Sequence, residues 1–370
     1  MRQIEIKVSV KKRIVKKIKN AKKLFGVFMA ALMVTMLVPL SGCGGNSDEV
    51  IRIFNWGDFM DESIFEDFRA QTGIQVIISY YASNEEMYAR ISSGGGSEFD
   101  LIFPSDYKIE QMIREGLLAP INFNNIPNLR YIDERFFDLP FDPDNRYSVP
   151  YKWGTLGILY NTTMVGNTVV DSWDVLWDSQ FAGNIFMYDS MRDSFAVALK
   201  RLGYSLNTTN IDELHAARDS LIEQRPLVRA FVTDDVKNAM IVGEAALAVV
   251  YSGDAMFSIS QNPDLNYVVP REGSNIWFDS AVIPAGARNQ AGAEAFINFI
   301  NDPQIAMRNT MYTGFSTTNR GALELLPEEM SNNPIYWPSD EVYYRSEAFI
   351  DLGEFTHAFN RAWTEVLAAQ

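Results

Sequence analysis

The sequence predicts an α/β fold in two lobes, each built around a mostly parallel sheet. Strand-like and helix-like segments alternate from residue 50 onward, and the same alternation resumes after a long extended stretch at residues 147–161. Parallel strands need helical crossovers between them, so this alternation is typical of α/β proteins. The 370 residues also exceed the length of one ordinary domain.

The first lobe is expected to begin with a strand at residues 50–56, VIRIFNW, where β-branched and aromatic residues dominate. A helix follows in MDESIFEDFRAQTG, with Asp61 as its N-cap and Gly73 just past its end. IQVIISYYA predicts a second strand, and SNEE, starting at Ser83, is a capping box that opens another helix. FDLIFPS predicts a third strand that a proline ends.

The second lobe is expected after YSVPYKWGTLGILYN, residues 147–161. Its predicted elements are shorter: GNIFMYD, the helix-like SFAVALKRLGY and the buried-strand run AALAVVYSG. A further helix is expected in AGAEAFINFIND, and the chain ends in proline-containing and helical segments. No repeat period interrupts this pattern, which favours two α/β lobes.

Residues 1–42 have a different character from the rest. They carry ten Lys or Arg and one acid, followed by the apolar run LFGVFMAALMVTMLVPL, which is the order of an export signal. A transmembrane anchor is the alternative, since the run is near spanning length. LSGC, ending at Cys43, resembles the lipobox of bacterial lipoproteins, which implies cleavage before Cys43 and its lipidation. Residues 43–49 would then be the lipidated cysteine and a flexible tether.

The mature chain is strongly acidic. Without residues 1–42 it has 22 basic and 46 acidic residues, a formal charge of 22 − 46 = −24. Such a field repels nucleic acids and anionic head groups and attracts cations, although a well-solvated surface is the simpler explanation. Cys43 is the only cysteine, so the fold must be held by core burial without an internal disulfide.

Five segments that follow predicted strands combine an aromatic residue with an acid: NWGDF, PSDY, YDSMRD, YSGDA and WFDS. Ligands of open parallel sheets bind beyond the carboxyl ends of the strands, so these segments are the candidate site. Ring faces attract organic ammonium groups, and carboxylates hold them by charge-assisted hydrogen bonds. The combination favours a diamine or polyamine, with acids at its ends and aromatic walls between them.

Catalytic motifs are nearly absent from the sequence. The only histidines are His215 and His357, and no G-x-S-x-G, Walker A or H-E-x-x-H sequence occurs. We therefore expect no enzyme activity, no catalytic residue and no cofactor.

A ferric site is the main alternative to an amine site, because tyrosine pairs suit iron. Tyr80 and Tyr81 are adjacent in a predicted strand and should point to opposite faces. Tyr343 and Tyr344 have the same difficulty on a helix. We expect no metal, but keep ferric ion or a sugar as alternative ligands.

Several longer segments resemble one family, the spermidine/putrescine-binding proteins of bacterial ABC importers. They include FNWGDF, TGIQVIISYYASNEEMYARI, FDLPFDPDNRYSVPYKWG and REGSNIWFDSAVIPAGA, and the resemblance covers nearly the whole mature chain. It implies a two-lobed type II periplasmic-binding-protein fold with a ligand cleft between lobes that crossing strands join. The implied lobes are residues 50–153 with 279–325, and residues 154–278 with 326–370.

The resemblance also implies ligand-binding roles for single residues. Trp56 matches a tryptophan that stacks on the ligand, and Asp279 matches the carboxylate of a W-x-D pair that takes a terminal amine. The other matched positions supply aromatic walls or hydroxyl groups: Phe59, Ser105, Tyr107, Thr233 and Trp277.

Other positions depart from the spermidine pattern of that family. Where the pattern has two acids in D-A-R-E, Ser190 replaces the first and Asp193 the second. Where it has W-N-G-S, Tyr251 replaces the tryptophan and Asp254 is an added acid. We expect Asp254 to take over part of the role that Ser190, which is not an acid, cannot fill. Phe315 stands at the place of a pocket tyrosine. These changes leave the choice between spermidine and putrescine open.

Each candidate also has a purely structural explanation. Trp277 suits a core or hinge aromatic, Asp189 and Asp193 suit the start of a helix, and Asp254 suits a helix cap. On the family resemblance, we expect a monomeric receptor, lipid-anchored on the outer face of the membrane or periplasmic. It would deliver a polyamine to an ABC permease with its ATPase.

Overall fold

The computed structural model describes residues 49–369 apart from residue 234. The predicted signal peptide, Cys43 and all but the last residue of the predicted tether lie outside the described residues. Within them, no helix has both the length and the apolar character needed to cross a bilayer.

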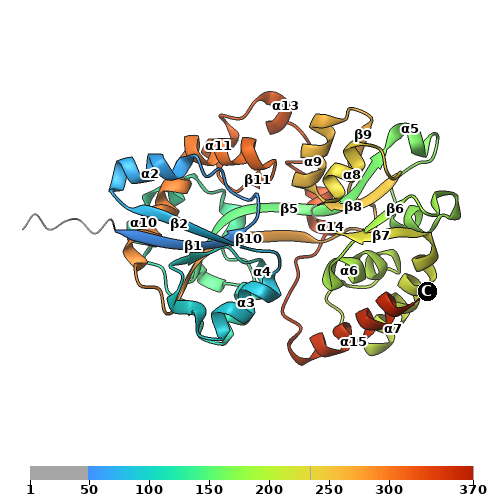
Figure 1. Cartoon of the computed structure of the whole chain (residues 1–370), viewed down its shortest axis with the longest axis horizontal. Helices are drawn as coiled ribbons and strands as arrows, with labels where there is room; N and C mark the ends of the chain where they lie inside the picture. Colours follow the sequence, from blue (N-terminus) through green and yellow to red (C-terminus); the bar gives the residue numbers. More distant parts are fainter. Residues whose placement is uncertain (1–48, 234, 370) are drawn as a thin grey trace, which may run out of the picture. The chain divides into compact units, whose positions relative to one another are not determined.

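The strands form one continuous path in the order β2-β1-β3-β10-β5-β8-β6-β7 (Figure 1). β1 runs parallel to β2 and β3, and β6 runs parallel to β7 and β8. β5 and β10 pair antiparallel with each other between these two parallel groups. The strands on this path are β1 Val50–Trp56, β2 Gln75–Tyr81, β3 Leu101–Ile102, β5 Ser148–Asn161, β6 Ile185–Tyr188, β7 Val228–Val232, β8 Leu247–Tyr251 and β10 Ile276–Pro284.

Three short strands lie off this path. β4 pairs with β10, whereas β9 and β11 pair with β5. They are β4 Leu118–Ala119, β9 Leu265–Val268 and β11 Ser316–Thr317. The expected parallel pairing is therefore present in each half of the sheet, while the strands that join the halves are antiparallel.

The long strands β5 and β10 join the two parallel groups. β5 pairs with β10 over its first half and with β8 over its second half. All but one residue of β5, and every residue of β10, is buried. These two buried strands therefore connect the two parallel groups of strands, and they cross the centre of Figure 1.

Helices lie between the strands along the chain. They are α2 Ile64–Thr72, α3 Asn84–Ser92, α4 Asp106–Arg114, α5 Thr162–Val165, α6 Met191–Arg201, α7 Ile211–Gln224, α8 Val236–Ile241, α9 Ser252–Gln261, α10 Gln290–Ile300, α11 Pro303–Thr313, α12 Arg320–Leu323, α13 Glu328–Ser331, α14 Asp340–Arg345 and α15 Thr356–Ala368. Short 3-10 turns occur at Gly95–Ser97, Phe123–Asn125, Pro127–Tyr131, Glu134–Phe136, Pro143–Asn145, Trp173–Trp177, Ser179–Phe181, Arg225–Leu227 and Gly353–Phe355.

The predicted helix ends are mostly correct. Ser83 Oγ accepts the Glu86 amide at 3.1 Å, and Gly73 ends α2 with a φ of 78°. The prediction that Asp61 caps this helix is wrong, because α2 begins at Ile64 and its N-cap is Ser63. Asp61 instead accepts the Ser63 amide, so its side chain stabilises the turn before the helix.

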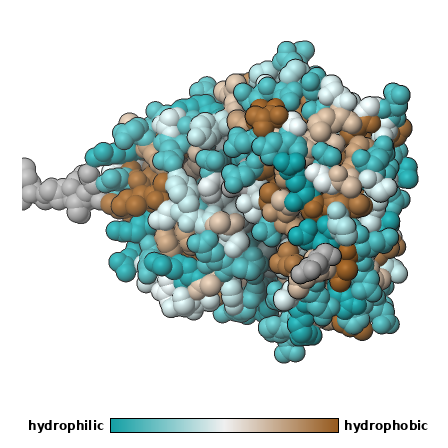
Figure 2. Space-filling view, turned by 45° about the vertical axis from the view of Figure 1, so that its right-hand side comes forward, coloured by the Kyte–Doolittle hydropathy of each residue, from teal (hydrophilic) through white to brown (hydrophobic). Residues whose placement is uncertain are grey.

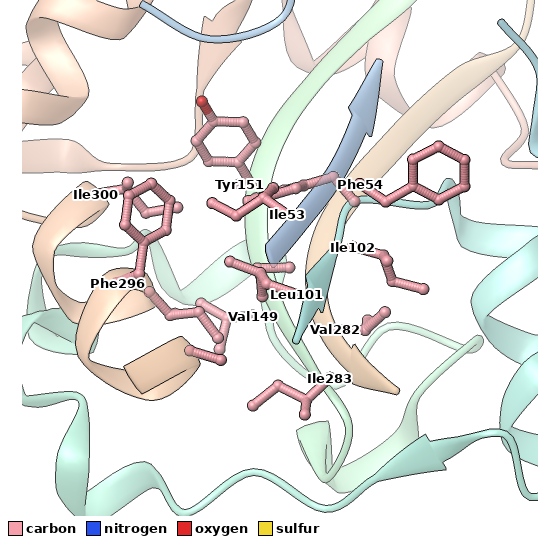
Figure 3. Close-up of a cluster of buried hydrophobic side chains, with 14 of the residues drawn as sticks. Ile53, Phe54, Leu101, Ile102, Val149, Tyr151, Val282, Ile283, Phe296 and Ile300 are labelled. Atoms are coloured by element: carbon pink, nitrogen blue, oxygen red, sulfur yellow. The ribbon is translucent and has the colours of Figure 1, made fainter. Parts of the chain in front are cut away.

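The hydrophobic core divides in a way that follows the two parallel groups. One cluster draws its buried residues from positions 51–153 and 276–305, and a second draws them from positions 156–249 and 352–366. In the first, Ile53, Leu101, Val149 and Val282 come from four neighbouring strands, and Phe296 comes from α10 (Figure 3). On the face drawn in Figure 2, hydrophilic residues cover most of the surface and hydrophobic ones lie in small groups.

Candidate ligand-binding site

The carboxyl ends of the parallel strands carry several of the predicted site residues. Trp56 is the last residue of β1, and Tyr251 is the last residue of β8. Ser105 and Ser190 are the N-caps of α4 and α6, which follow β3 and β6. Tyr251 packs against both of the main core clusters, so this end of β8 lies where the two parts of the core meet.

Aromatic rings from three separate segments surround Trp277. Its ring centroid lies 6.4 Å from that of Phe59, 5.9 Å from that of Tyr251 and 5.6 Å from that of Phe315. The indole is buried, and its Nε1 has no hydrogen-bond partner among the described residues. A buried indole N–H normally has an acceptor, so this donor is available to a ligand or a water molecule.

Two glycines make room for these rings. Gly154 lies opposite Trp277 in the register of β5 and β10, and a Cβ on it would come within 2.8 Å of the indole. A Cβ on Gly253 would lie 2.2 Å from the ring of Phe315. Contacts this short do not occur, so both positions must lack a side chain for the rings to lie where they do.

Trp56 contacts a different part of the wall. Its ring centroid lies 4.7 Å from that of Tyr81, and its Nε1 donates to the carbonyl oxygen of Phe103 at 2.8 Å. The orientation of the indole is therefore fixed before any ligand arrives.

Asp279 is a buried carboxylate on β10 with only 5% of its surface exposed. It is hydrogen-bonded to Ser105, and its Oδ1 has no partner among the described residues. Burial raises the pKa of Asp279 to about 7, although the Ser105 hydrogen bond and the charge of Lys152 oppose this. Such a group gains most from a cation that reaches its free oxygen.

Asp193 is a second buried carboxylate, with 4% of its surface exposed, in the first turn of α6. Ser190 Oγ accepts its backbone amide at 3.5 Å, and its side chain is hydrogen-bonded to Tyr251. Its Oδ1 has no partner in the described part of the chain. Burial raises the pKa of Asp193, while Ser190, Tyr251 and Arg192 oppose this. The site thus holds two carboxylates, each with one free oxygen, on different segments.

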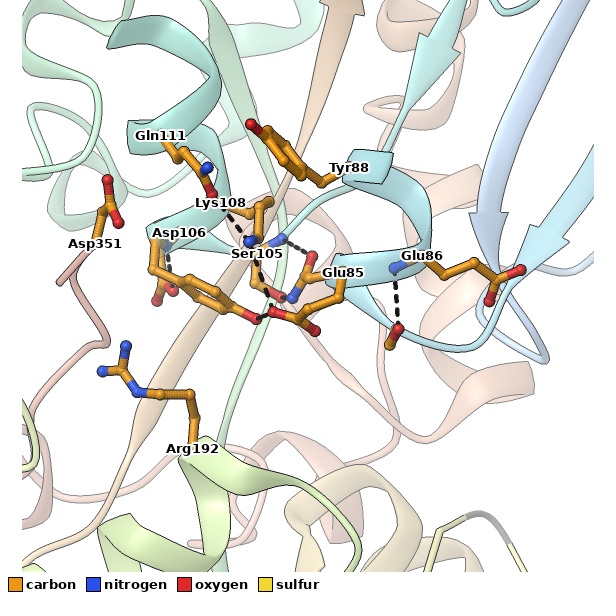
Figure 4. Close-up of polar contacts among 12 residues, drawn as sticks. Glu85, Glu86, Tyr88, Ser105, Asp106, Lys108, Gln111, Arg192 and Asp351 are labelled. Atoms are coloured by element: carbon orange, nitrogen blue, oxygen red, sulfur yellow. Dashed lines mark hydrogen bonds and ion pairs between the residues drawn. The ribbon is translucent and has the colours of Figure 1, made fainter. Parts of the chain in front are cut away.

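Tyr107 lies at the start of α4, between Asp106 and Lys108 in the chain. Those two residues are labelled in the polar cluster of Figure 4, together with Glu85 and Arg192. The hydroxyl of Tyr107 donates to Glu85 Oε1 at 3.0 Å, and its ring centroid lies 6.0 Å from that of Phe349. The guanidinium of Arg192, which comes from α6, lies 4.3 Å from the ring of Phe349 and 5.7 Å from that of Tyr107. The start of α4, the start of α6 and the segment that carries Phe349 therefore meet through these side chains.

Two predicted residues lie outside this set of contacts. Thr233 is exposed. Its backbone carbonyl accepts a hydrogen bond from the amide of Val236, the first residue of α8. Asp254 is buried in the first turn of α9, and its Oδ1 lies 3.4 Å from Lys237 Nζ. Asp189, the alternative helix cap, is exposed and is not the cap of α6, which is Ser190.

Metal-ligand geometry is not found among the described residues, where no group of three or more His, Cys, Asp or Glu side chains could hold an ion. Tyr80 is 46% exposed and Tyr81 is buried, so the two adjacent tyrosines do point to opposite faces of β2.

Sequence reasoning missed Lys152, a buried lysine on β5 that lies opposite Asp279 in register. Its Nζ donates to the carbonyl oxygen of Asn309 at 3.3 Å and to Thr313 Oγ1. Burial lowers the pKa of Lys152 to about 7, against the effect of the Asp279 charge. A lone charged residue within the apolar run YSVPYKWGTLGILYN was the available signal.

Asp106 was missed as well, although it is fully buried at the start of α4. Its two oxygens accept the amides of Tyr107 at 2.7 Å and of Phe278 at 3.3 Å. Burial raises its pKa well above the usual range, and the charge of Asp279 adds to this. Asp106 therefore links α4 to β10, with its oxygens already used by backbone groups.

Comparison with known proteins connects this geometry to a family. Residues 63–337 match the family described as "Bacterial extracellular solute-binding protein". The spermidine/putrescine-binding periplasmic protein of Salmonella typhimurium is 33% identical over 335 residues, which cover 90% of this chain and 96% of the relative. The putrescine-binding periplasmic protein SpuD of Pseudomonas aeruginosa is 31% identical, covering 93% and 98%.

A solved structure agrees with these sequence matches. A Listeria monocytogenes protein provisionally named a spermidine/putrescine ABC transporter is 42% identical, with a TM-score of 0.84, and the match covers 87% of this chain and all of that one. The expected two-lobed periplasmic-binding fold is therefore confirmed. By its family match and its relatives, this chain belongs to the bacterial extracellular solute-binding proteins.

Proposed function

We propose that this protein captures a polyamine, spermidine or putrescine, outside the cytoplasm and delivers it to an ABC permease. The observation that carries the proposal is the pair of buried carboxylates, Asp279 and Asp193, each with an oxygen that lacks a partner among the described residues. A ligand with ammonium groups at both ends supplies a partner for each. The names of the relatives from Salmonella typhimurium and Pseudomonas aeruginosa support the same ligand class.

The aromatic residues serve the part of the ligand between its charged ends. A ring face attracts an ammonium group by roughly 0.5 to 2 kcal/mol and covers the adjoining methylenes. Trp277, with Phe59 and Phe315 around it, provides such faces close to Asp279 along β10. Burial then excludes water, which strengthens each ion pair and makes an unpaired acid costly.

The proposed site comprises two acids, the aromatic walls and the hydroxyl groups that orient them, with a third acid at its edge. In full it is Trp56, Phe59, Ser105, Tyr107, Ser190, Asp193, Thr233, Tyr251, Asp254, Trp277, Asp279 and Phe315.

The proposed division into lobes places residues 50–153 with 279–325 and residues 154–278 with 326–370. The division of the hydrophobic core supports it. We infer that the protein acts as a monomer, does no chemistry on its ligand and works with a permease and its ATPase. Lipidation at Cys43 would hold it at the outer face of the membrane, and labelled fatty acid should then be incorporated into the parent but not into Cys43→Ser. A parent that incorporates no label contradicts the lipid anchor.

A thermal-shift screen tests the ligand class. A ligand that binds only the folded state adds about 2.7 kcal/mol to the free energy of unfolding when its concentration is a hundred times its Kd. The melting temperature rises as a result. We expect putrescine or spermidine to raise it, and glucose, maltose and Fe³⁺ to leave it unchanged. A shift with a sugar, or a coloured Fe³⁺ complex without an amine response, overturns the proposal, and turnover of a bound amine reveals an enzyme instead.

A further inference from the structure

Lys152 lies within the proposed site without being one of the ligand-binding residues named above. It pairs with Asp279 across β5 and β10, just as Gly154 pairs with Trp277. Paired residues of antiparallel strands project from the same face, and so do residues two apart on one strand. Lys152 therefore projects from the face of the crossing strands that carries Trp277 and Asp279.

The ammonium of Lys152 is held in one place. Its Nζ lies 5.6 Å from the ring centroid of Phe59 and 5.5 Å from that of Tyr151. It also donates to Asn309 O and Thr313 Oγ1, which belong to the last turns of α11. The carboxyl end of a helix stabilises positive charge, so these contacts favour the charged form of the lysine against the burial that lowers its pKa to about 7.

The same lysine makes no ion pair in the described part of the chain. The charges of Lys152 and Asp279 influence each other. The hydrogen-bond partners of Lys152 Nζ, however, are Asn309 O and Thr313 Oγ1, and neither is a carboxylate oxygen. A buried lysine that lacks a close counter-ion is destabilising, and an apolar residue of similar length would pack there at less cost. Packing alone does not explain a lysine that is 2% exposed.

We propose that Lys152 is a specificity-determining residue, whose fixed ammonium biases the site toward amines with fewer positive charges, a diamine over a triamine. This inference rests on the proposed function. The ammonium of Lys152 occupies the aromatic surface of Phe59 and Tyr151, so this surface is not open to an ammonium group of the ligand.

The bias follows from Coulomb's law. The charged form of Lys152 repels each ammonium of a ligand, with an energy that grows as the distance between the two charges falls. The repulsion is strong where water is excluded. Putrescine brings two ammonium groups into the site and spermidine brings three. Removing Lys152 should therefore improve the binding of spermidine more than that of putrescine.

Calorimetry of the full protein with putrescine and with spermidine at pH 7 tests this inference. In Lys152→Met we expect the ratio of the putrescine Kd to the spermidine Kd to rise at least about tenfold relative to the parent. Lys152→Gln should do the same if the methionine variant does not fold, and Lys152→Arg, which keeps the charge, should retain the parent ratio.

A second lysine provides the matched control. Lys200 is partly buried and pairs with Glu347 at 2.7 Å, so Lys200→Met removes a similar side chain without touching β5. Its ratio should equal that of the parent. A ratio within twofold of the parent in both neutral Lys152 variants overturns the inference. Failure of the parent to bind either amine overturns the proposed function instead.

Discussion

Asp279 and Lys152 face each other in register across β10 and β5, and both side chains are almost fully buried. Burial moves their titration toward the same pH, since the pKa of Asp279 is raised to about 7 and that of Lys152 is lowered to about 7. The crossing strands therefore carry two groups that change charge near neutral pH, at the place where we propose that the ligand binds.

The first prediction concerns Asp279→Asn. The change removes the proposed partner of a ligand ammonium, and truncating a buried charge partner costs about 2 to 5 kcal/mol. We expect amine binding to weaken by at least about thirtyfold. Calorimetry measures it, and Asp189→Asn, the same change at an exposed residue, should bind like the parent. Unchanged affinity in Asp279→Asn would remove Asp279 from the site.

The second prediction concerns the stability of the ligand-free protein. A carboxyl whose pKa rises from 3.8 to about 7 on folding is destabilising once it is ionised, by at most roughly 4 kcal/mol. Its contribution is favourable at low pH and is lost as the pH rises from about 4 through 7. Asp279→Asn avoids this loss, so urea denaturation should find it roughly 1 to 3 kcal/mol more stable than the parent at pH 8. At pH 4 the two should be similar, and an equal difference at both values contradicts the prediction.

The third prediction concerns the pH dependence of amine binding. Asp279 must be ionised to hold an ammonium, and below its pKa of about 7 it is increasingly protonated. The raised pKa of Asp193 acts in the same direction. We expect the Kd for putrescine to rise from pH 8 to pH 6, approaching about tenfold per unit below pH 7. A Kd that stays constant over this range shows that neither carboxylate titrates there.

The fourth prediction concerns Tyr251→Phe. The change removes the hydroxyl that bonds to Asp193 but keeps the ring, which packs on Tyr188 and Trp277. A hydrogen bond to a charged group contributes about 1.5 to 3 kcal/mol, so affinity for either amine should fall by about tenfold or more with the fold intact. Tyr160→Phe, on β5, should bind like the parent, and a similar loss there would indicate a general structural effect.

The fifth prediction concerns Asp254, which shares its carboxylate with Lys237. If it takes over part of the role that Ser190 cannot fill, Asp254→Ala should weaken spermidine binding by roughly three- to tenfold, less than Asp193→Ala, because Lys237 already neutralises part of its charge. Lys237→Met removes this neutralising positive charge and should strengthen binding. Binding of both amines equal to the parent in Asp254→Ala would show that this acid serves the fold alone.

Local signals predicted much of the fold. Ser83 begins a helix and Gly73 ends one, as predicted, because capping depends on neighbours in the chain. The expectation that ligands bind beyond the carboxyl ends of parallel strands pointed to Trp56 and Tyr251. Asp61 was misassigned because a turn and a helix cap use the same side-chain hydrogen bond.

The missed parts of the site depend on contacts between distant segments. The placement of Lys152 beside Asp279 follows from the register of two strands that are more than 100 residues apart. Arg192 reaches the ring of Phe349 across a similar separation. No local pattern encodes such pairings, because they are set by how the whole sheet assembles.

The absence of a side chain at Gly253 has a consequence for how this site could change over generations. Any larger residue there would collide with the ring of Phe315, which in turn packs on Trp277. A larger residue at Gly253 alone would leave a clash, and a small residue at Phe315 alone would leave a void, so the two must be exchanged together for a new pocket shape to arise. Ligand preference in this lineage is therefore easier to alter through charges, such as Lys152, than through the shape of its aromatic wall.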